Sequence, residues 1–581
     1  MPKPPTKRSA GVTTGKDGRG GAAFGKYGPV AVVAAGGAAA AWALNRIARR
    51  GGPSWDPLPL DPDLVDHMAP AGPDTSFPDA GTPGDGPRQT QPADIVRTVR
   101  PVMLDGEDAE PTQVEVTRPA APGRHPVIVF AHGAGTGGHE EFAEHTEQLA
   151  QRGIACVVAD KAPEFFGLKH RDYEEMGRRY ALLGRWARTQ DFAEPDRTGY
   201  YGESEGAWIV PLAIAEFDPD AAFAALISAP VMSMRRQGLF AGGAYLANTR
   251  VPAGVRRVLP RLFGTRFPFG WAEYLDFDVR PYQRRLTCPV FVAYGVDDAS
   301  MPQVEGAAWI EQDLAEAGND QLAVRYYRGN HGLRVPGPDE PPDAPVAARQ
   351  CDWTGKTRPL NPDFARDLAA WVSGLPGAAR PRDRVAGVAP SQPFQAGPPP
   401  QLPARGQLAV QALAGAAALG ALGVPAAVGM ARGARRLRGK RGEAHDAGRP
   451  GSAVMAPALP AGTAGPLAAL AAGAAATWAA HGTYLKTAIA MSLDYRRDDR
   501  LITWGYRGVR ALAAASAGAA GWLLERCLRS GRPARGARAR LVLGAGGAGL
   551  LQALAAYWGA TPRPEPPGDF RPRSFLSVVC D

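Results

Sequence analysis

The sequence has few cysteines, and their spacing is not one that binds metal. Its 581 residues include five cysteines without a CxxC pair, so neither a zinc site nor a disulfide framework is indicated. Cys156 and Cys288 stand in strand-like apolar runs, where a free cysteine is typically a small core residue; the others are Cys351, Cys527 and Cys580. We expect no metal and no cofactor.

A stripe of lysine and arginine interleaved with aromatic residues is also missing from the middle of the chain. Nucleic acid is therefore not an expected partner, although the formal net charge is +9. The positive charge lies instead beside apolar segments, where it bears on membrane topology.

The chain is longer than one ordinary domain. Stretches rich in proline and glycine divide it into parts of different composition. In chain order we expect a disordered basic N-terminus (1–27), a transmembrane helix or signal anchor (28–45), a Pro/Gly-rich linker (46–93), an α/β domain (94–376), a second linker (377–406), a four-helix membrane domain (407–560) and a tail (561–581).

Five apolar stretches are poor in charge over about the thickness of a bilayer. The first, residues 28–44, also fits the apolar part of a signal peptide. The basic loops between the later ones follow the positive-inside rule, and with a cytoplasmic N-terminus five crossings leave the α/β domain outside the cytoplasm. The alternative is a set of Ala-rich soluble helices. The later stretches are Leu408–Ala431, Thr463–Ala480, Val509–Leu524 and Leu541–Gly559.

The α/β domain alternates short apolar runs with helical patterns. Runs without polar interruption are typical of strands buried on both faces of a parallel sheet, and residues 172–190 carry apolar side chains at helical spacing. We therefore expect a mostly parallel sheet with helices on both faces. The expected strands are residues 126–135, 154–160, 224–230, 288–295 and 322–329.

The stretch GYYGESEGAW, residues 199–208, sets Ser204 between two glycines where a strand-like run meets a helical one. A turn tight enough to expose a serine strains its backbone and brings neighbouring chain close. Small residues, here Gly202 and Gly206, are then needed two positions on either side. The GxSxG motif alone is weak, but strand, turn and helix occur in the required order.

A serine nucleophile needs a base and a carboxylate that orients the base. Asp298 follows one expected strand in GVDDASMP, and His331 follows the next in GNHGL. The neighbouring Asp297 is the alternative carboxylate. The order Ser204, Asp298, His331 is the one expected for a serine at a strand-to-helix turn of this kind.

These motifs, together with HGAG at residues 132–135, resemble the α/β-hydrolase superfamily, and more narrowly its dienelactone-hydrolase and serine-aminopeptidase-like branches. The resemblance covers the α/β domain alone. It implies an α/β-hydrolase fold with Ser204 as nucleophile, His331 as general base and acid, and Asp298 as the orienting carboxylate. Dienelactone hydrolases carry cysteine where this chain has Ser204.

The resemblance also implies supporting residues. The backbone N–H groups of Glu205 and Ala134 would form an oxyanion hole, beside Gly133, and His132 would support that loop rather than act as the base. The carboxylates of Glu203 and Glu205 are expected to face solvent or brace the loop, since a carboxylate beside an oxyanion opposes the developing charge.

The insertion at residues 231–286 stands where this fold usually carries a lid. We expect either an amphipathic cap with its own small core, or a pocket for an acyl chain or a face on anionic headgroups. Together these features predict a membrane-anchored serine hydrolase of an ester, thioester or amide, acting on a small-molecule or lipid acyl substrate. The alternatives are an acyltransferase using the same residues on an envelope acceptor, and a non-catalytic membrane sensor or binding module.

Overall fold

The computed structural model describes residues 58–77, 93–104, 110–167, 169–249, 251–256, 258–267, 269–342, 358–376, 383–397, 459–493, 499–529 and 535–560, with helical positions 411, 412, 415, 416, 418 and 420. The chain forms two compact units, one built on a sheet and one of C-terminal helices. The expected N-terminal membrane segment (28–45), the tail (561–581) and most of Leu408–Ala431 lie outside the described residues.

The first unit is built on one nine-stranded sheet with the order β1-β2-β4-β3-β5-β6-β7-β8-β9. The β1–β2 and β2–β4 pairs are antiparallel and every later pair is parallel. The mostly parallel α/β sheet expected from the sequence is thereby confirmed. Its strands are β1 (Ile95–Val102), β2 (Thr112–Pro119), β3 (His125–Ala131), β4 (Ala155–Ala159), β5 (Ala193–Glu203), β6 (Ala224–Ile227), β7 (Val290–Gly295), β8 (Leu322–Tyr327) and β9 (Val385–Gly387).

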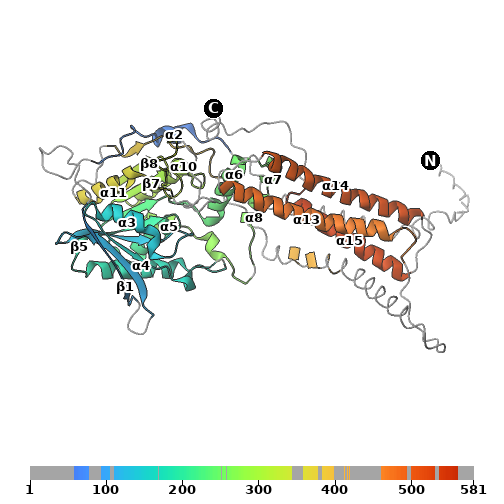
Figure 1. Ribbon diagram of the computed structural model, residues 1–581, viewed down its shortest axis with the longest axis horizontal. Helices are drawn as coiled ribbons and strands as arrows, with labels where there is room; N and C mark the ends of the chain where they lie inside the picture. The colour runs from blue at the N-terminus through green and yellow to red at the C-terminus, as the bar shows by residue number, and fades with distance from the viewer. Residues whose placement is uncertain are drawn as a thin grey trace, which may run out of the picture. The chain divides into compact units, whose positions relative to one another are not determined.

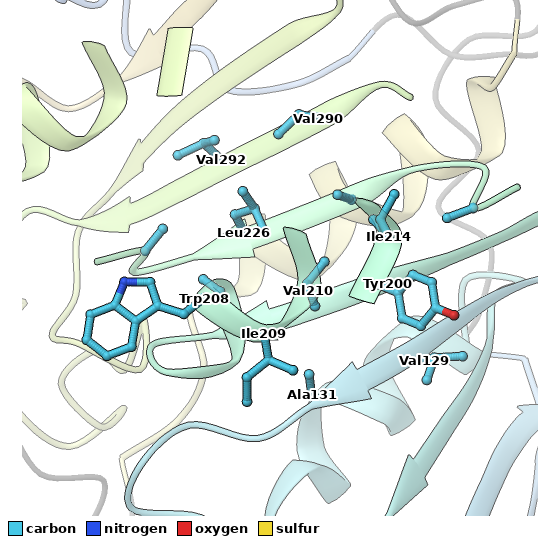
Figure 2. Packing of buried hydrophobic residues seen from close by; sticks show 14 of the residues in the cluster. Val129, Ala131, Tyr200, Trp208, Ile209, Val210, Ile214, Leu226, Val290 and Val292 are labelled. Atoms are coloured by element: carbon cyan, nitrogen blue, oxygen red, sulfur yellow. The ribbon is translucent and has the colours of Figure 1, made fainter. Parts of the chain in front are cut away.

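Both faces of the sheet are covered by helices (Figure 1). Val127 and Val129 of β3 pack in the apolar cluster that also holds residues of α4, α5 and α10, whereas Ile128 and Phe130 pack in the cluster with α3 and α11. Figure 2 shows the first of these clusters between α5 and the central strands. The helices are α3 (Ala143–Ala150), α4 (Tyr173–Arg188), α5 (Gly206–Leu212), α10 (Gln303–Glu316) and α11 (Pro362–Gly374).

The sheet unit reaches beyond the expected 94–376 boundaries. Met68 and Phe77 are buried in its two apolar clusters, and Phe394 is fully buried. Backbone N–H groups also join the outer segments, because Ala71 donates to the carbonyl of Val385 and Gly387 to that of Gly72. The assignment of residues 58–77 and 383–397 to linkers is therefore wrong, since apolar side chains in both segments complete the core.

Short helices fill the insertion between β6 and β7. Arg235 ties them together, because its guanidinium binds the Asp276 carboxylate at 2.6 Å and the carbonyl oxygens of Phe263 and Thr265. The insertion contains α6 (Met234–Asn248), α7 (Ala253–Arg256), α8 (Leu259–Phe263), η4 (Glu273–Asp276) and α9 (Arg280–Gln283); the remaining short elements of the unit are α2 (Pro62–His67), η1 (His139–Phe142), η2 (Pro163–Phe165) and η3 (Ala213–Phe217).

The C-terminal helices are α13 (Ala464–Leu493), α14 (Asp499–Arg529) and α15 (Arg535–Tyr557). The second unit contains α13 up to His481, α14 from Arg507 onward and all of α15. These helices cover most of the last three apolar stretches expected from the sequence. Small residues let the helices approach closely, since a Cβ on Gly473 would lie 2.9 Å from Cβ of Ser516. By length and composition, one helix among the described residues, Gly536–Tyr557, is suited to cross a membrane. The other described helices do not meet that criterion.

Candidate active site

Ser204 stands at the turn between β5 and α5, in a backbone conformation that few residues other than glycine adopt. Its φ is +55°, and its N–H donates to the carbonyl of Ile227 at 2.9 Å. A Cβ on Gly202 would lie 2.5 Å from the Gly206 carbonyl oxygen, and one on Gly206 would lie 2.2 Å from that of Ala131. The two glycines are therefore required by close backbone contact, and the turn presents a half-buried serine.

Asp298 and His331 meet at the carboxyl ends of β7 and β8. Oδ2 of Asp298 lies 2.8 Å from Nδ1 of His331, and the aspartate is almost fully buried. The other carboxylate oxygen, Oδ1, accepts the backbone N–H of Ser300 at 2.8 Å and its hydroxyl. Oδ2 therefore holds Nδ1–H of the imidazole, which leaves the lone pair on Nε2 as the proton acceptor. Asp297 instead accepts the backbone N–H of Gly329 at 3.3 Å.

Sequence reasoning missed Ser228, which fixes the backbone of His331. Its hydroxyl donates to the His331 carbonyl at 2.6 Å, and its own N–H donates to the carbonyl of Ala293 at 2.8 Å. Ser228 follows β6 and has a φ of +47°. No motif marks it, because its role depends on strands that are distant in the sequence.

The charge of His331 depends on two carboxylates. Burial of the imidazole opposes protonation, but the charge of Asp298, its hydrogen bond and the charge of Glu203 outweigh this and raise the pKa of His331. Glu203 is itself buried and accepts the hydroxyl of Tyr201 at 3.1 Å. Burial raises the pKa of Glu203 as well. The expectation that its carboxylate faces solvent is therefore wrong, since the side chain lies inside the sheet unit.

The loop after β3 lies against the turn of Ser204. A Cβ on Gly133 would lie 3.2 Å from the Glu203 carbonyl oxygen and 3.3 Å from Cβ of Ser204. His132 is fully buried, and its Nε2–H donates to the Ala159 carbonyl of β4 at 2.9 Å. Burial lowers the pKa of His132 to about 4, so it is neutral near pH 7. Ala134, which follows Gly133, is exposed in the turn.

Glu205 binds two cations in a buried cluster. Its carboxylate accepts Nζ of Lys161 at 2.8 Å, the guanidinium of Arg171, and the hydroxyl of Tyr173 at 3.0 Å. Lys161 also donates to the carbonyl of Gly133 at 3.0 Å. One ammonium group thus joins the loop after β3 to the residue that follows Ser204. The solvent-facing alternative for Glu205 is wrong, and the loop-bracing alternative matches these contacts.

One group of described residues has donor atoms close enough to share a metal ion. The donor atoms of His139, Glu140 and Asp160 lie within 4.8 Å of one another. Asp160 Oδ1, however, already accepts both Nδ1–H and the backbone N–H of His139, at 2.7 and 2.9 Å. The Glu140 side chain is 71% exposed. Hydrogen bonds between the start of η1 and the residue after β4 account for this arrangement.

Neither a protein-family model nor a curated protein matches the chain. Among solved structures, a putative dienelactone hydrolase from Klebsiella pneumoniae subsp. pneumoniae MGH 78578 is 16% identical, with 41% of this chain and 87% of that chain covered and a TM-score of 0.28. Est1E from Butyrivibrio proteoclasticus is 16% identical, with 40% and 89% covered and a TM-score of 0.27. Thermogutta terrifontis esterase 2, phosphoramylated by tabun, is 18% identical, with 40% and 83% covered and a TM-score of 0.28.

At these identities and TM-scores the comparisons assign neither a fold nor an activity to this chain. The fold itself is plain in this chain: the sheet is mostly parallel, and a strand, a strained serine turn and a helix follow one another at β5, Ser204 and α5. These are the features of an α/β-hydrolase-like domain.

Proposed function

We propose that the protein is a membrane-anchored serine hydrolase that cleaves an ester, thioester or amide through an acyl-enzyme on Ser204. The observation that carries the proposal is the hydrogen-bonded pair of Asp298 and His331 at the same sheet edge as the strained turn of Ser204. Labelling of the purified full-length chain by a fluorophosphonate probe, with release of acid from ester substrates, tests it.

In the proposed reaction, Oγ of Ser204 attacks the carbonyl carbon while its proton passes to Nε2 of His331. The oxyanion accepts hydrogen bonds from the backbone N–H groups of Glu205 and Ala134. The bond to the leaving group then breaks, and the imidazolium returns the proton to that group. Water then attacks the acyl-enzyme by the same steps, which releases the acid and regenerates the Ser204 hydroxyl. The Asp298 and Glu203 carboxylates stabilise the imidazolium, in keeping with the raised pKa of His331.

The raised pKa of His331 gives a testable pH dependence. The base must be neutral to accept the serine proton, so kcat/KM should fall as pH falls through a pKa above the ordinary range of histidine. Glu203→Gln removes one carboxylate that raises this pKa and should move the acid limb to lower pH. Full pH profiles of kcat/KM measure the shift. Glu140→Gln, at an exposed position, should leave the limb in place; a limb that Glu203→Gln leaves unchanged contradicts the coupling.

Lys161 is expected to position the oxyanion hole, because it binds both the Gly133 carbonyl and the Glu205 carboxylate. Lys161→Met should lower kcat by about 10²-fold with a smaller change in KM, since loss of one oxyanion donor costs about 10² to 10³. Steady-state kinetics measures both parameters.

Arg171→Met is the matched control for this prediction. It also removes one cation from Glu205 but leaves the Lys161 bond to Gly133 intact, so kcat should fall much less. Both variants should lose stability, because each leaves a buried carboxylate with one cation fewer. Equal kcat losses, scaling with the loss in thermal stability, would contradict a positioning role.

The five crossings expected from the sequence would place Ser204 on the extracytoplasmic side, where the substrate is an envelope or external acyl compound. Of the described helices, α13 and α14 do not meet the length and composition criterion for a crossing. The apolar helix Gly536–Tyr557 supports anchoring. A reporter cysteine at Val99, which is 49% exposed on β1, should react with an impermeant thiol reagent in intact cells. Reaction only after lysis would place the domain in the cytoplasm.

An acyltransferase would use the same residues but deliver the acyl group to an acceptor other than water. Product analysis with and without an added alcohol or amine acceptor distinguishes the two activities. A sensor or binding module would bind acyl compounds without turnover and without reaction at Ser204.

A further inference from the structure

The insertion between β6 and β7 exposes four large apolar side chains close together in the sequence. Phe269 is 88% exposed, Leu262 51%, Trp271 43% and Phe267 42%. The rings of Phe269 and Trp271 lie with their centroids 6.1 Å apart. We call these four residues the aromatic edge. Single exposed apolar residues are normal on a protein surface, but a group of them marks an interaction site.

The backbone holds the aromatic edge in an unfavourable conformation. Phe269, Gly270 and Ala272 have φ values of +63°, +72° and +58°, in the left-handed region that phenylalanine and alanine disfavour. The turn is nevertheless fixed, since the N–H of Ala272 donates to the Lys169 carbonyl at 2.6 Å. The side chain of Ala272 is buried while its neighbours point outward. The fold therefore maintains a strained turn that leaves the rings of Phe269 and Trp271 exposed.

The segment that carries the aromatic edge has a surplus of positive charge. Residues 251–272 contain four arginines, Arg256, Arg257, Arg261 and Arg266, and no aspartate or glutamate. Lys169 adds a further cation, with Nζ 4.6 Å from the centre of the Trp271 ring. One carboxylate, that of Glu273, lies beside the turn, with Oε1 3.8 Å from a Cβ built on Gly270. The next, Asp276, is bound by Arg235.

We infer that the aromatic edge binds the headgroup region of an anionic lipid bilayer. Tryptophan and phenylalanine favour the boundary between headgroups and acyl chains, and arginine attracts anionic lipid. The surplus of positive charge opposes the pairing of this surface with a second copy of itself. The apolar helix Gly536–Tyr557 supplies a reason for the chain to reside at a bilayer. This inference is independent of catalysis at Ser204.

An environment-sensitive fluorophore on Phe269→Cys tests the inference in the full-length chain. Serine replaces Cys351, Cys527 and Cys580, while the buried Cys156 and Cys288 remain. The protein is reconstituted into vesicles of phosphatidylcholine, with or without phosphatidylglycerol, that contain bromine-labelled lipid as a quencher. We expect a blue shift and several-fold stronger quenching at position 269 than at the control Val99→Cys, which is also exposed.

The anionic part of the inference has its own test. Quenching at position 269 should increase when phosphatidylglycerol is present, and Arg261→Gln with Arg266→Gln should remove that increase. Quenching that is equal at positions 269 and 99, or that ignores phosphatidylglycerol and the two arginines, would overturn the inference. So would a blue shift that disappears as the protein is diluted in excess lipid, because that result would identify a second copy of the chain as the occupant.

Discussion

Ser204→Ala is expected to abolish labelling by fluorophosphonates and to lower kcat on the order of 10⁶-fold, the loss measured when a serine nucleophile acting with a histidine base is removed. The hydroxyl is the atom that bonds to the acyl carbon, and no other group at the turn replaces it. Alanine occupies the same backbone position without new contacts, so the fold should survive. Gel-based labelling, ester turnover and thermal unfolding of the same preparation measure the three effects.

Ser373→Ala is a suitable control for the nucleophile, because Ser373 is an exposed serine at the end of α11. It should label and turn over like the parent chain. His331→Ala should lose about as much activity as Ser204→Ala, since the members of such a group act as a unit and their effects do not add. Labelling that persists on another serine would move the nucleophile, and activity retained without His331 would require a different base.

Local sequence signals were sufficient for the central parallel strands and for the turn of Ser204. The strands β4, β6 and β7 coincide with uninterrupted apolar runs and β3 with a run that begins at Pro126, because a strand buried on both faces is mostly apolar. The run of β8 is interrupted only by the buried Arg325. Gly202 and Gly206 were predictable for a similar reason, since a backbone contact near 2.5 Å excludes any side chain. Asp298 and His331 were predictable because polar residues that follow parallel strands gather at one edge.

The rest depended on contacts between distant segments. Lys161 and Glu205 are 44 residues apart, and no periodicity links a lysine after β4 to a glutamate after Ser204. The edge strands were also missed: β9 has three residues, and β1 mixes arginine and proline with valine. Residues 58–77 and 383–397 gave no sequence signal of a folded segment either, because their apolar residues are few and are buried only once the sheet has formed.

Asp298→Asn should lower kcat about 10⁴-fold, the loss found when the carboxylate of such a group becomes an amide. The structure gives the reason. The backbone N–H of Ser300 donates to Oδ1 at 2.8 Å and can only be satisfied by an acceptor, so the amide oxygen must stay there. The amide NH₂ then faces Nδ1 of His331 at the former Oδ2 position. Nδ1 becomes the acceptor, Nε2 carries the proton, and the serine has no base.

Asp297→Asn is the matched comparison at the neighbouring position. Its amide oxygen can still accept the backbone N–H of Gly329, which Asp297 binds at 3.3 Å, and the Asp298–His331 hydrogen bond is unaffected. We therefore expect a much smaller loss, measured as kcat/KM beside the thermal stability of both variants. A larger loss at 297 than at 298, with both variants folded, would assign the orienting role to Asp297. A shift of the acid limb of the pH profile to lower pH in Asp298→Asn but not in Asp297→Asn would independently identify Asp298 as a carboxylate that raises the pKa of His331.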